Sequence, residues 1–359
     1  MPGAGGADIF PAREVNMEIG ILGLPQSGKS TLFEIMTGIK SREIFGEPSV
    51  RGQARVPDAR FDLLASVFNP AKVTPASVPF VDICVQGDSP WDSIRKTLSS
   101  ADGLVHVVDA FTAESPSEVA SRYSKLADEL TVSDLIVVEG RLEKLAKIQK
   151  AAQKPEEAAQ AEIFPRLKEA LESGKPAREL GLSPSELHAL RGFSLWTLRP
   201  ELVVVNCRED NLSFAEEFAK GSKVPSPVVG ICCQMEAEIA ELPPEDREQF
   251  LAQMGVAEPA FERIIRTAFR SLGRVCYFTV GEDEVRAWVI PANSTAPRAA
   301  AAIHKDFERG FIKAEVVSYE DFVSCGKTLP GAKAAGKLRL EGKEYIVADG
   351  DIISFRFNV

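Results

Sequence analysis

The run Gly23-Leu24-Pro25-Gln26-Ser27-Gly28-Lys29-Ser30-Thr31 contains the residue types and the spacing of a phosphate-binding loop. Gly23 and Gly28 permit a tight turn in which successive backbone N–H groups point toward phosphate oxygens. Lys29, the expected catalytic group, supplies a full positive charge to the β- and γ-phosphates, and the Ser30 hydroxyl is a ligand for Mg²⁺. The other loop residues expected to contact a nucleotide are Pro25, Gln26, Ser27 and Thr31.

The residues on either side of this loop supply the elements that must position it. Residues 17–22 are an apolar run typical of a buried strand, and residues 32–36 carry apolar side chains at helical spacing. A helix that begins near Lys29 adds its positive dipole end and its free N–H groups to the loop. The alternative is a turn that is merely rich in small residues. Strand, glycine-bounded turn and helix together favour a site for a nucleoside triphosphate.

Length and composition limit the classes of function. A chain of 359 residues predicts two or three domains, and 45% apolar with 26% charged residues is ordinary for a globular protein. The net charge of −10 argues against binding of DNA or RNA by the whole surface, but it leaves room for a local basic face.

Targeting and cysteine signals favour a cytoplasmic protein. No apolar run is long enough to span a bilayer, and residues 1–16 lack the apolar stretch of a signal peptide. We interpret residues 1–16 as a disordered extension. The six cysteines form no C-x-x-C pair and have no histidine at zinc spacing, which indicates reduced, buried thiols.

Apolar runs that alternate with helical patterns predict an α/β domain with a mostly parallel sheet. After the first helix, residues 38–60 have an irregular pattern in the place of a nucleotide switch, and a short helix is expected over 61–68. The P-loop nucleotide-binding domain then comprises residues 17–112 and 196–274. Its further strands are expected at Val78–Val85, Gly103–Asp109, Glu201–Asn206 and Val228–Cys232.

An inserted helical segment interrupts this domain. Residues 115–118 place serine at an N-cap, proline at the first helical position and glutamate three residues after the cap, which predicts a helix start. Lys154-Pro155-Glu156 predicts a break between two helices, and Ser183 has the capping pattern of one more. We therefore expect residues 113–195 to form a coiled-coil hairpin, or helical arm.

The C-terminal residues 275–359 have the pattern of strands and turns. Turn signals at Glu341-Gly342 and Asp349-Gly350 separate strand-like runs, and one helix is expected at Ala296–Lys305. A small mixed sheet crossed by one helix predicts a β-grasp module. The expected strands are Cys276–Val280, Val285–Ile290, Phe311–Val317, Lys337–Leu340, Glu344–Val347 and Ile352–Phe357.

This C-terminal region also contains five distinctive motifs, Phe278–Gly281, Val285–Trp288, Ile303–Phe311, Tyr319–Phe322 and Ile352–Val359. They resemble the TGS domain of the YchF / Obg-like ATPases, a branch of the translation-factor-related P-loop NTPases. The phosphate-binding loop and the inserted helical pair match that family as well, so the resemblance extends over nearly the whole chain. It implies a G-domain-like α/β fold with a coiled-coil arm and a C-terminal TGS-like β-grasp domain.

Asn206-Cys207-Arg208-Glu209 stands where GTPases that read guanine carry N-K-x-D. It resembles the N-x-x-E form of the YchF branch, whose members favour ATP over GTP, so the resemblance implies that Asn206 and Glu209 bind the base. Two alternatives stay open. A polar residue that simply ends a strand would do without a ligand, and Glu209 or Asp210 in a distorted loop would serve guanine.

The switch residues differ from those of a hydrolysing family member. Asp82 begins the run that corresponds to D-x-x-G, and the resemblance implies that it holds Mg²⁺ through water together with Ser30, but the glycine of that motif is missing. No threonine lies between Thr37 and Thr74, and Ser49 is a weak substitute. The family's loop with a candidate catalytic histidine is deleted. Loss of one such group costs ~10²–10³ in rate, so we expect slow or absent hydrolysis.

The three histidines present in the chain are expected to be structural; they are His106, His188 and His304.

The resemblance further implies contact with the ribosome or rRNA through the TGS domain and the helical arm. Residues 275–359 are the least acidic region, with eleven Lys and Arg against twelve Asp and Glu. Their basic side chains form either a phosphate-contacting face or a solvated mixed surface. These side chains are Arg298, Lys305, Arg309, Lys313, Lys327, Lys333, Lys337 and Arg339.

We therefore expect a Mg²⁺-dependent P-loop NTPase that binds ATP in preference to GTP, hydrolyses it slowly and acts with the ribosome, without a membrane or DNA partner. The alternative is a non-hydrolysing adaptor that senses nucleotide and binds the ribosome or RNA through its TGS domain and helical arm.

Overall fold

The computed structural model describes residues 17–41, 44, 47, 49–83, 94, 98–148, 154–222, 224–253 and 256–358. These residues form two compact units, which we call the P-loop unit (residues 17–54 and 78–272) and the C-terminal unit (residues 55–77 and 273–358). The expected extension of residues 1–16 lies outside the described residues.

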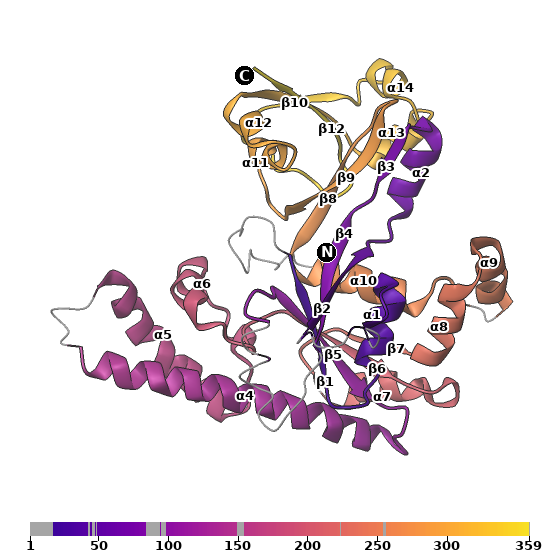
Figure 1. Ribbon diagram of the computed structural model, residues 1–359. Helices are drawn as coiled ribbons and strands as arrows, with labels where there is room; N and C mark the ends of the chain where they lie inside the picture. Colours follow the sequence, from indigo (N-terminus) through magenta and orange to yellow (C-terminus); the bar gives the residue numbers. More distant parts are fainter. Residues whose placement is uncertain are drawn as a thin grey trace. The chain divides into compact units, whose positions relative to one another are not determined.

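The P-loop unit contains a six-stranded sheet in the order β2-β4-β1-β5-β6-β7 (Figure 1). β1 pairs in parallel with β4 and β5, β5 pairs in parallel with β6, and β6 with β7. This arrangement confirms the predicted α/β class with a mostly parallel sheet. The strands are β1 Ile19–Gly23, β2 Ser49–Arg55, β4 Ser77–Ile83, β5 Gly103–Asp109, β6 Glu201–Asn206 and β7 Val228–Ile231.

Helices pack on this sheet because its inner strands β1, β5 and β6 are apolar along most of their length. α1 packs against α8 and α10, and α10 also contacts β5, β6 and β7. α7 packs against β7, where Phe218 joins a core with Val108, Val203 and Val205. The helices are α1 Lys29–Thr37, α7 Ser213–Gly221, α8 Cys233–Glu241, α9 Pro244–Gln253 and α10 Ala260–Ser271, and the turn η5 spans Glu209–Asn211.

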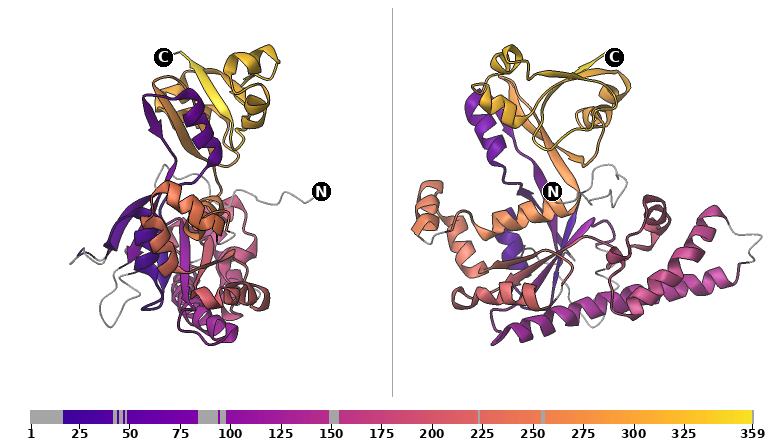
Figure 2. Two further views of the ribbon diagram at one scale, coloured as in Figure 1. Left: turned by 90° about the vertical axis from the view of Figure 1, so that its right-hand side faces the viewer. Right: turned by 180° about the vertical axis from the view of Figure 1, so that it is seen from behind.

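The expected helical hairpin is present between β5 and β6. α4 Pro116–Ala146 and α5 Pro155–Glu172 pack side by side and run in opposite directions (Figures 1 and 2). Ser115 caps α4 by accepting from the Glu118 N–H, as its sequence predicted. The hairpin core includes Val138, Ile163, Phe164, Leu167 and Leu171, and the chain returns through η3 Ala177–Leu180, α6 Pro184–Leu190 and η4 Arg191–Phe193.

The C-terminal unit contains a second six-stranded sheet, in the order β11-β10-β12-β8-β9-β3. A cluster with Tyr277, Ala299, Phe311, Val316 and Ile353 forms its core. The strands are β3 Lys72–Thr74, β8 Arg274–Thr279, β9 Glu284–Pro291, β10 Phe311–Val317, β11 Arg339–Glu341 and β12 Ile352–Phe357. The helices are α2 Ala59–Phe68, α11 Ala296–Ala301, α12 Lys305–Arg309, α13 Tyr319–Ser324 and α14 Leu329–Ala334.

Three features differ from the expectations. Residues 55–77, which the sequence placed in the P-loop domain, belong to the C-terminal unit: β3 pairs in parallel with β9, and Phe61 and Phe68 of α2 lie against the rings of Phe278 and Phe322. Residues 38–60 were expected to be irregular, but they include β2. The run expected to be a strand at 344–347 forms only an isolated bridge from Ile346 to Thr295.

The described helices include none that is long and apolar enough to cross a membrane. The described cysteines, Cys207, Cys232, Cys233, Cys276 and Cys325, are free thiols.

Candidate nucleotide-binding site

The phosphate-binding loop joins β1 to α1 and takes two backbone conformations in the left-handed region. Gln26 has φ 64° and Gly28 has φ 98°, so the loop turns sharply before the helix begins at Lys29. At Gly23 a Cβ would come within 2.5 Å of the Val107 carbonyl oxygen and of the Ser27 hydroxyl. Glycine is therefore required at Gly23 by close packing against β5, and it is favoured at Gly28 by the backbone angle.

Lys29 lies across the loop that it follows. Its Nζ donates to the carbonyl oxygens of Gly23 and Leu24, both at 2.9 Å. Burial lowers the pKa of Lys29, and the negative charge of Asp82 offsets part of that effect. The ammonium is therefore held at the mouth of the loop, where an incoming phosphate would offer it a full negative charge.

The remaining loop residues surround this position. Pro25 and Gln26 are exposed at the apex of the loop, whereas Ser30 and Thr31 are half-buried in the first turn of α1. Ser27 is fully buried, and its hydroxyl has no hydrogen-bond partner within the described part of the chain. The helix begins without a side-chain cap, so its first N–H groups are not satisfied by a capping side chain.

Asp82 on β4 is the acidic residue near Lys29. Its side chain is fully buried; one oxygen accepts from the Ser41 hydroxyl at 2.7 Å, and Oδ1 has no partner among the described residues. A buried carboxylate oxygen without a donor favours a cation or its bound water nearby. Since Ser30 and Asp82 are oxygen donors of the kind that Mg²⁺ prefers, these residues fit that metal.

Protein groups alone do not make a metal site in the described residues, because no group of three or more His, Cys, Asp or Glu is placed to hold a metal ion there. Magnesium in phosphoryl-transfer sites takes most of its remaining ligands from phosphate and water. The residues Cys84, Val85 and Gly87, which the sequence compared with the switch motif, lie outside the described residues.

Asn206, at the end of β6, connects three parts of the site with one amide. Its Nδ2 donates to the carbonyl oxygen of Ser27 at 3.1 Å, and its Oδ1 accepts from the backbone N–H of Cys233 at 3.2 Å. A Cβ on Gly28 would lie 2.4 Å from Nδ2, so the loop and the amide are in close contact. Asn206 therefore holds the phosphate-binding loop against the strand that precedes the expected base-binding residues.

Glu209 begins the turn η5 and its side chain is exposed. The backbone around it is fixed by Asn211, which accepts from the Arg208 N–H at 2.7 Å and donates to the Ala110 carbonyl oxygen at 3.0 Å. Arg208 itself is held by Asp210 and by the Phe111 carbonyl oxygen. A rigid turn thus presents the Glu209 carboxylate to solvent beside the ends of β5 and β6.

The histidines lie outside this loop cluster or are already engaged. His106 on β5 is 2% exposed and its Nδ1 lies 3.1 Å from a carboxylate oxygen of Glu201. His304 caps α12 by accepting from the Asp306 N–H, and His188 belongs to α6 of the arm. His106 is therefore already engaged inside the sheet, and His188 lies in the helical arm rather than at the loop.

Ser41 and Asn211 are site residues that the sequence did not single out. The sequence offered Ser49 as a weak substitute for the switch threonine. In the structure Ser49 begins β2. Ser41 reaches Asp82 across 41 residues of chain, a contact that no local pattern encodes. For Asn211 a signal was available, since asparagine is favoured where a side chain satisfies the backbone of a turn.

Comparison with known proteins gives a consistent result. Residues 275–358 match the family described as YchF-GTPase_C, protein of unknown function (DUF933). A Bacillus subtilis (strain 168) protein named Ribosome-binding ATPase YchF is 40% identical over 367 residues, which cover 95% of this chain and 99% of that protein. The rice (Oryza sativa subsp. japonica) protein named Obg-like ATPase 1 is 31% identical, with 96% and 93% covered.

A solved structure shares the fold as well. The Schizosaccharomyces pombe YchF GTPase superposes with a TM-score of 0.83 at 27% sequence identity, and the match covers 96% of this chain and 99% of that one.

Proposed function

The chain belongs to the YchF family of P-loop NTPases, and on that premise we propose that it binds ATP in preference to GTP, with Mg²⁺, and hydrolyses it slowly while acting with the ribosome. The observation that carries the nucleotide site is the loop itself: Lys29 crosses the loop mouth and Asn206 fixes the loop to β6.

Phosphate binding follows from the groups already in place. Lys29 Nζ would turn from the loop carbonyl oxygens to the β- and γ-phosphate oxygens, and the N–H groups at the start of α1 would face the same charge. Hydrolysis would proceed by in-line attack of water on the γ-phosphorus, which breaks the bond to the bridging oxygen and releases ADP. Lys29 stabilises the charge that develops on the phosphate oxygens.

Ser30 and Asp82 would hold Mg²⁺ in this complex. The bound metal supplies neutralisation of phosphate charge during the transfer. Asp82 would act through water. Its buried, unpaired Oδ1 would accept from a water on the metal, and Ser41 orients the other oxygen.

The proposed preference for adenine over guanine depends on Glu209, the side chain expected to contact the base. The aspartate of N-K-x-D accepts from two guanine N–H groups at once. Both bonds form only when the carboxylate is fixed at hydrogen-bond distance from the base. Glu209 has one more methylene, is exposed, and forms no hydrogen bond or ion pair with another described residue. Because a carboxylate that no neighbouring group holds is less well organised for two parallel bonds, it discriminates poorly in favour of guanine.

Slow hydrolysis is supported by the state of the one histidine in the strands beside the loop that the structure describes. His106 is bonded to Glu201 inside the sheet, so it does not reach a water on the γ-phosphate. A partner would then have to complete the site, and the ribosome is the candidate because relatives covering nearly the whole chain are named ribosome-binding ATPases. The C-terminal unit and the helical arm are the proposed contact surfaces.

Isothermal titration of ATP and GTP in the presence of Mg²⁺ tests the site and its base preference. We expect ATP to bind more tightly than GTP, and Lys29→Ala to weaken both by at least about tenfold because one charge-assisted contact is lost. The matched control is Lys147→Ala, since Lys147 lies at the end of α4 in the helical arm. Equal affinities for the two nucleotides would refute the base preference, and unaltered binding by Lys29→Ala would refute the site.

A single-turnover assay separates the enzyme from the non-hydrolysing adaptor. With radiolabelled ATP, and with and without ribosomes, we expect slow release of phosphate that Lys29→Ala abolishes. No turnover above background under either condition would favour the adaptor, which the buried state of His106 also favours.

A further inference from the structure

A pocket lies in the P-loop unit at the opposite end of the parallel strands from the phosphate-binding loop. Its volume is about 730 Å³, within the range of small-molecule sites. Glu18 precedes β1, Pro79 lies near the start of β4 and Ser100 precedes β5, whereas the phosphate-binding loop follows the carboxyl end of β1. The nucleotide proposal therefore does not account for this pocket.

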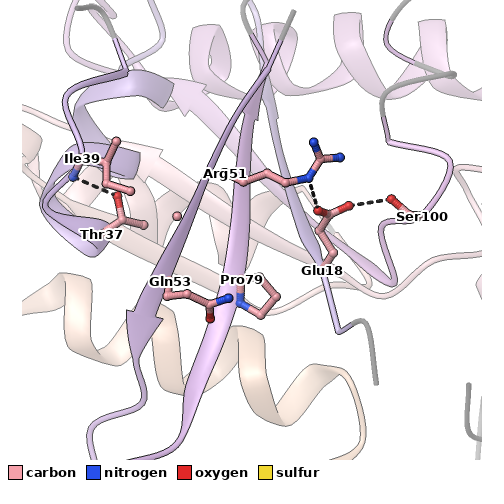
Figure 3. A pocket seen from close by; sticks show the side chains of 8 residues that line it. Glu18, Thr37, Ile39, Arg51, Gln53, Pro79 and Ser100 are labelled. Carbon is pink, nitrogen blue, oxygen red and sulfur yellow. Dashed lines mark hydrogen bonds and ion pairs between the residues drawn. The ribbon is translucent and has the colours of Figure 1, made fainter. Parts of the chain in front are cut away.

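Glu18 forms the fixed part of the pocket. The residue is 8% exposed, and both of its carboxylate oxygens are engaged: one accepts from Arg51 Nε and the other from the Ser100 hydroxyl, each at 2.6 Å (Figure 3). Each oxygen of this buried carboxylate therefore has a donor, and neither is left unpaired. Glu18 acts here as the group that holds Arg51 in place.

Arg51 is left with most of its donors unused. Only Nε is bonded, Glu18 is its sole partner among the described residues, and its side chain is 56% exposed where it lines the pocket. A guanidinium has five N–H donors in one plane, so fixing Nε leaves the four N–H groups of the two Nη atoms. These form the fork that matches the two oxygens of a carboxylate.

The rest of the lining is mixed, with two apolar side chains among polar ones. Ile39 and Pro79 contribute hydrocarbon, and the Thr37 hydroxyl is already used, since it donates to the Phe33 carbonyl oxygen and accepts from the Ile39 N–H. The amide of Gln53 also lines the pocket, and it has no partner in the described part of the chain. The pocket thus combines one oriented cation and one amide with the apolar side chains of Ile39 and Pro79.

We propose that this pocket binds a small organic acid, with its carboxylate on the Nη atoms of Arg51 and its apolar body against Ile39 and Pro79. The charge balance selects the ligand class. Glu18 already offsets the charge of Arg51, and no second cation is among the lining residues, so a monoanion is matched better than a phosphate dianion.

The test uses 4-methylbenzoate as the probe, with the phosphate-binding loop filled by saturating ADP and Mg²⁺. Amide resonances of the ¹⁵N-labelled full-length chain report the place and the affinity. We expect shifts at Gly52 and Ile39 without shifts at Gly23 and Gly28. Arg51→Gln should weaken binding by at least about tenfold, because the charge-assisted fork is lost.

Arg55→Gln is the matched control. Arg55 lies on the same strand, its side chain is equally exposed at 56%, and it pairs with Asp62 outside the pocket, so this variant should bind the probe as the parent does. Phenyl phosphate and the uncharged 4-methylbenzamide should bind at least about tenfold more weakly than the benzoate. Equal binding of the amide, equal binding by Arg51→Gln, or shifts at Gly23 and Gly28 instead would overturn the proposal. Tighter binding of phenyl phosphate would overturn the choice of a carboxylate.

Discussion

Single side chains join parts of the P-loop unit that are far apart in the sequence. Asn206 connects the phosphate-binding loop, β6 and the start of α8, and Glu201, at the other end of β6, joins a different set of segments. Glu201 accepts from Ser226 at 2.8 Å, forms an ion pair with Arg178 of η3 and lies beside His106 of β5. Each of these side chains bonds to several segments at once, so its removal leaves more than one group without its partner.

Replacing Asn206 tests whether its amide positions the phosphate-binding loop. Asn206→Ala leaves the Ser27 carbonyl oxygen and the Cys233 N–H without their partner, which costs about 1–3 kcal/mol of unfolding free energy. We expect ATP affinity to fall as well, because the loop loses its attachment to β6. Urea denaturation and titration calorimetry measure the two effects, and unchanged affinity in a folded variant would contradict the positioning role.

Glu201 makes stability depend on pH. Burial alone would raise its pKa, but the hydrogen bond from His106 and the charge of Arg178 lower the pKa to about 2. A carboxyl whose folded pKa is depressed stabilises the fold above its unfolded pKa, and that contribution is lost as pH falls toward the folded pKa. We therefore expect the difference in unfolding free energy between the parent and Glu201→Gln to narrow below about pH 4.5. Urea denaturation at a series of pH values measures it, and a constant difference would argue against this role.

At the scale of elements, Asp134 of α4 ties the helical arm to the segment that leads into β6. This carboxylate is fully buried and accepts from the backbone N–H groups of Trp196 and Thr197, at 3.0 and 2.7 Å, and from the Thr197 hydroxyl at 2.8 Å. The chain that returns from the arm to β6 is thereby fixed on the middle of α4.

Asp134→Ala should lower the unfolding free energy by about 3 kcal/mol or more, because a buried charged acceptor is removed and three donors lose their partner. Asp128→Ala is the control, since Asp128 lies on the same helix with an exposed side chain and should change stability little. Equal effects of the two substitutions in urea denaturation would show that Asp134 does not fasten the arm.

Local patterns predicted the elements whose signals lie within a few residues. The phosphate-binding loop is encoded by nine contiguous residues, and both helix starts with Ser-Pro-Ser-Glu were capped as expected. β2 was missed because its buried positions include Gly52 and Ala54, which lack the bulk and branching that mark a strand. The place of β2 in the sheet depends on its pairing with β4, and the contact of Ser41 with Asp82 joins residues 41 positions apart. A local stretch of sequence contains neither interaction.

For the whole molecule, the main difference from the predicted organisation is that residues 55–77 complete the C-terminal unit. Arg60 of α2 donates to Asp58 and pairs with Asp349, which holds this segment to the turn before β12. Thr74 donates to the Glu284 carboxylate at 2.6 Å, and Lys72 pairs with the same carboxylate. The sequence matches the family over residues 275–358, but the fold needs the earlier segment as well.

A fragment of residues 273–359 should therefore not fold by itself. Without α2, Phe278 and Phe322 lose their aromatic neighbours, and without β3, β9 becomes an open edge. We expect poor amide dispersion in the NMR spectrum of this fragment, and native-like dispersion when residues 55–77 are joined to it by a flexible linker. A well-dispersed spectrum of the fragment alone would refute the requirement.

The split C-terminal unit also fixes an order of events during synthesis. A ribosome releases β3 and α2 early, yet Glu284, which bonds Thr74, is made 210 residues later. β12 lies between β10 and β8 in the sheet, so the strand that joins the two halves of the sheet is made long after β3. The nascent chain must keep residues 55–77 unpaired until β9 and β12 have been made. A chain that stopped before Ile352 would lack β12 and would leave that segment without a folded partner.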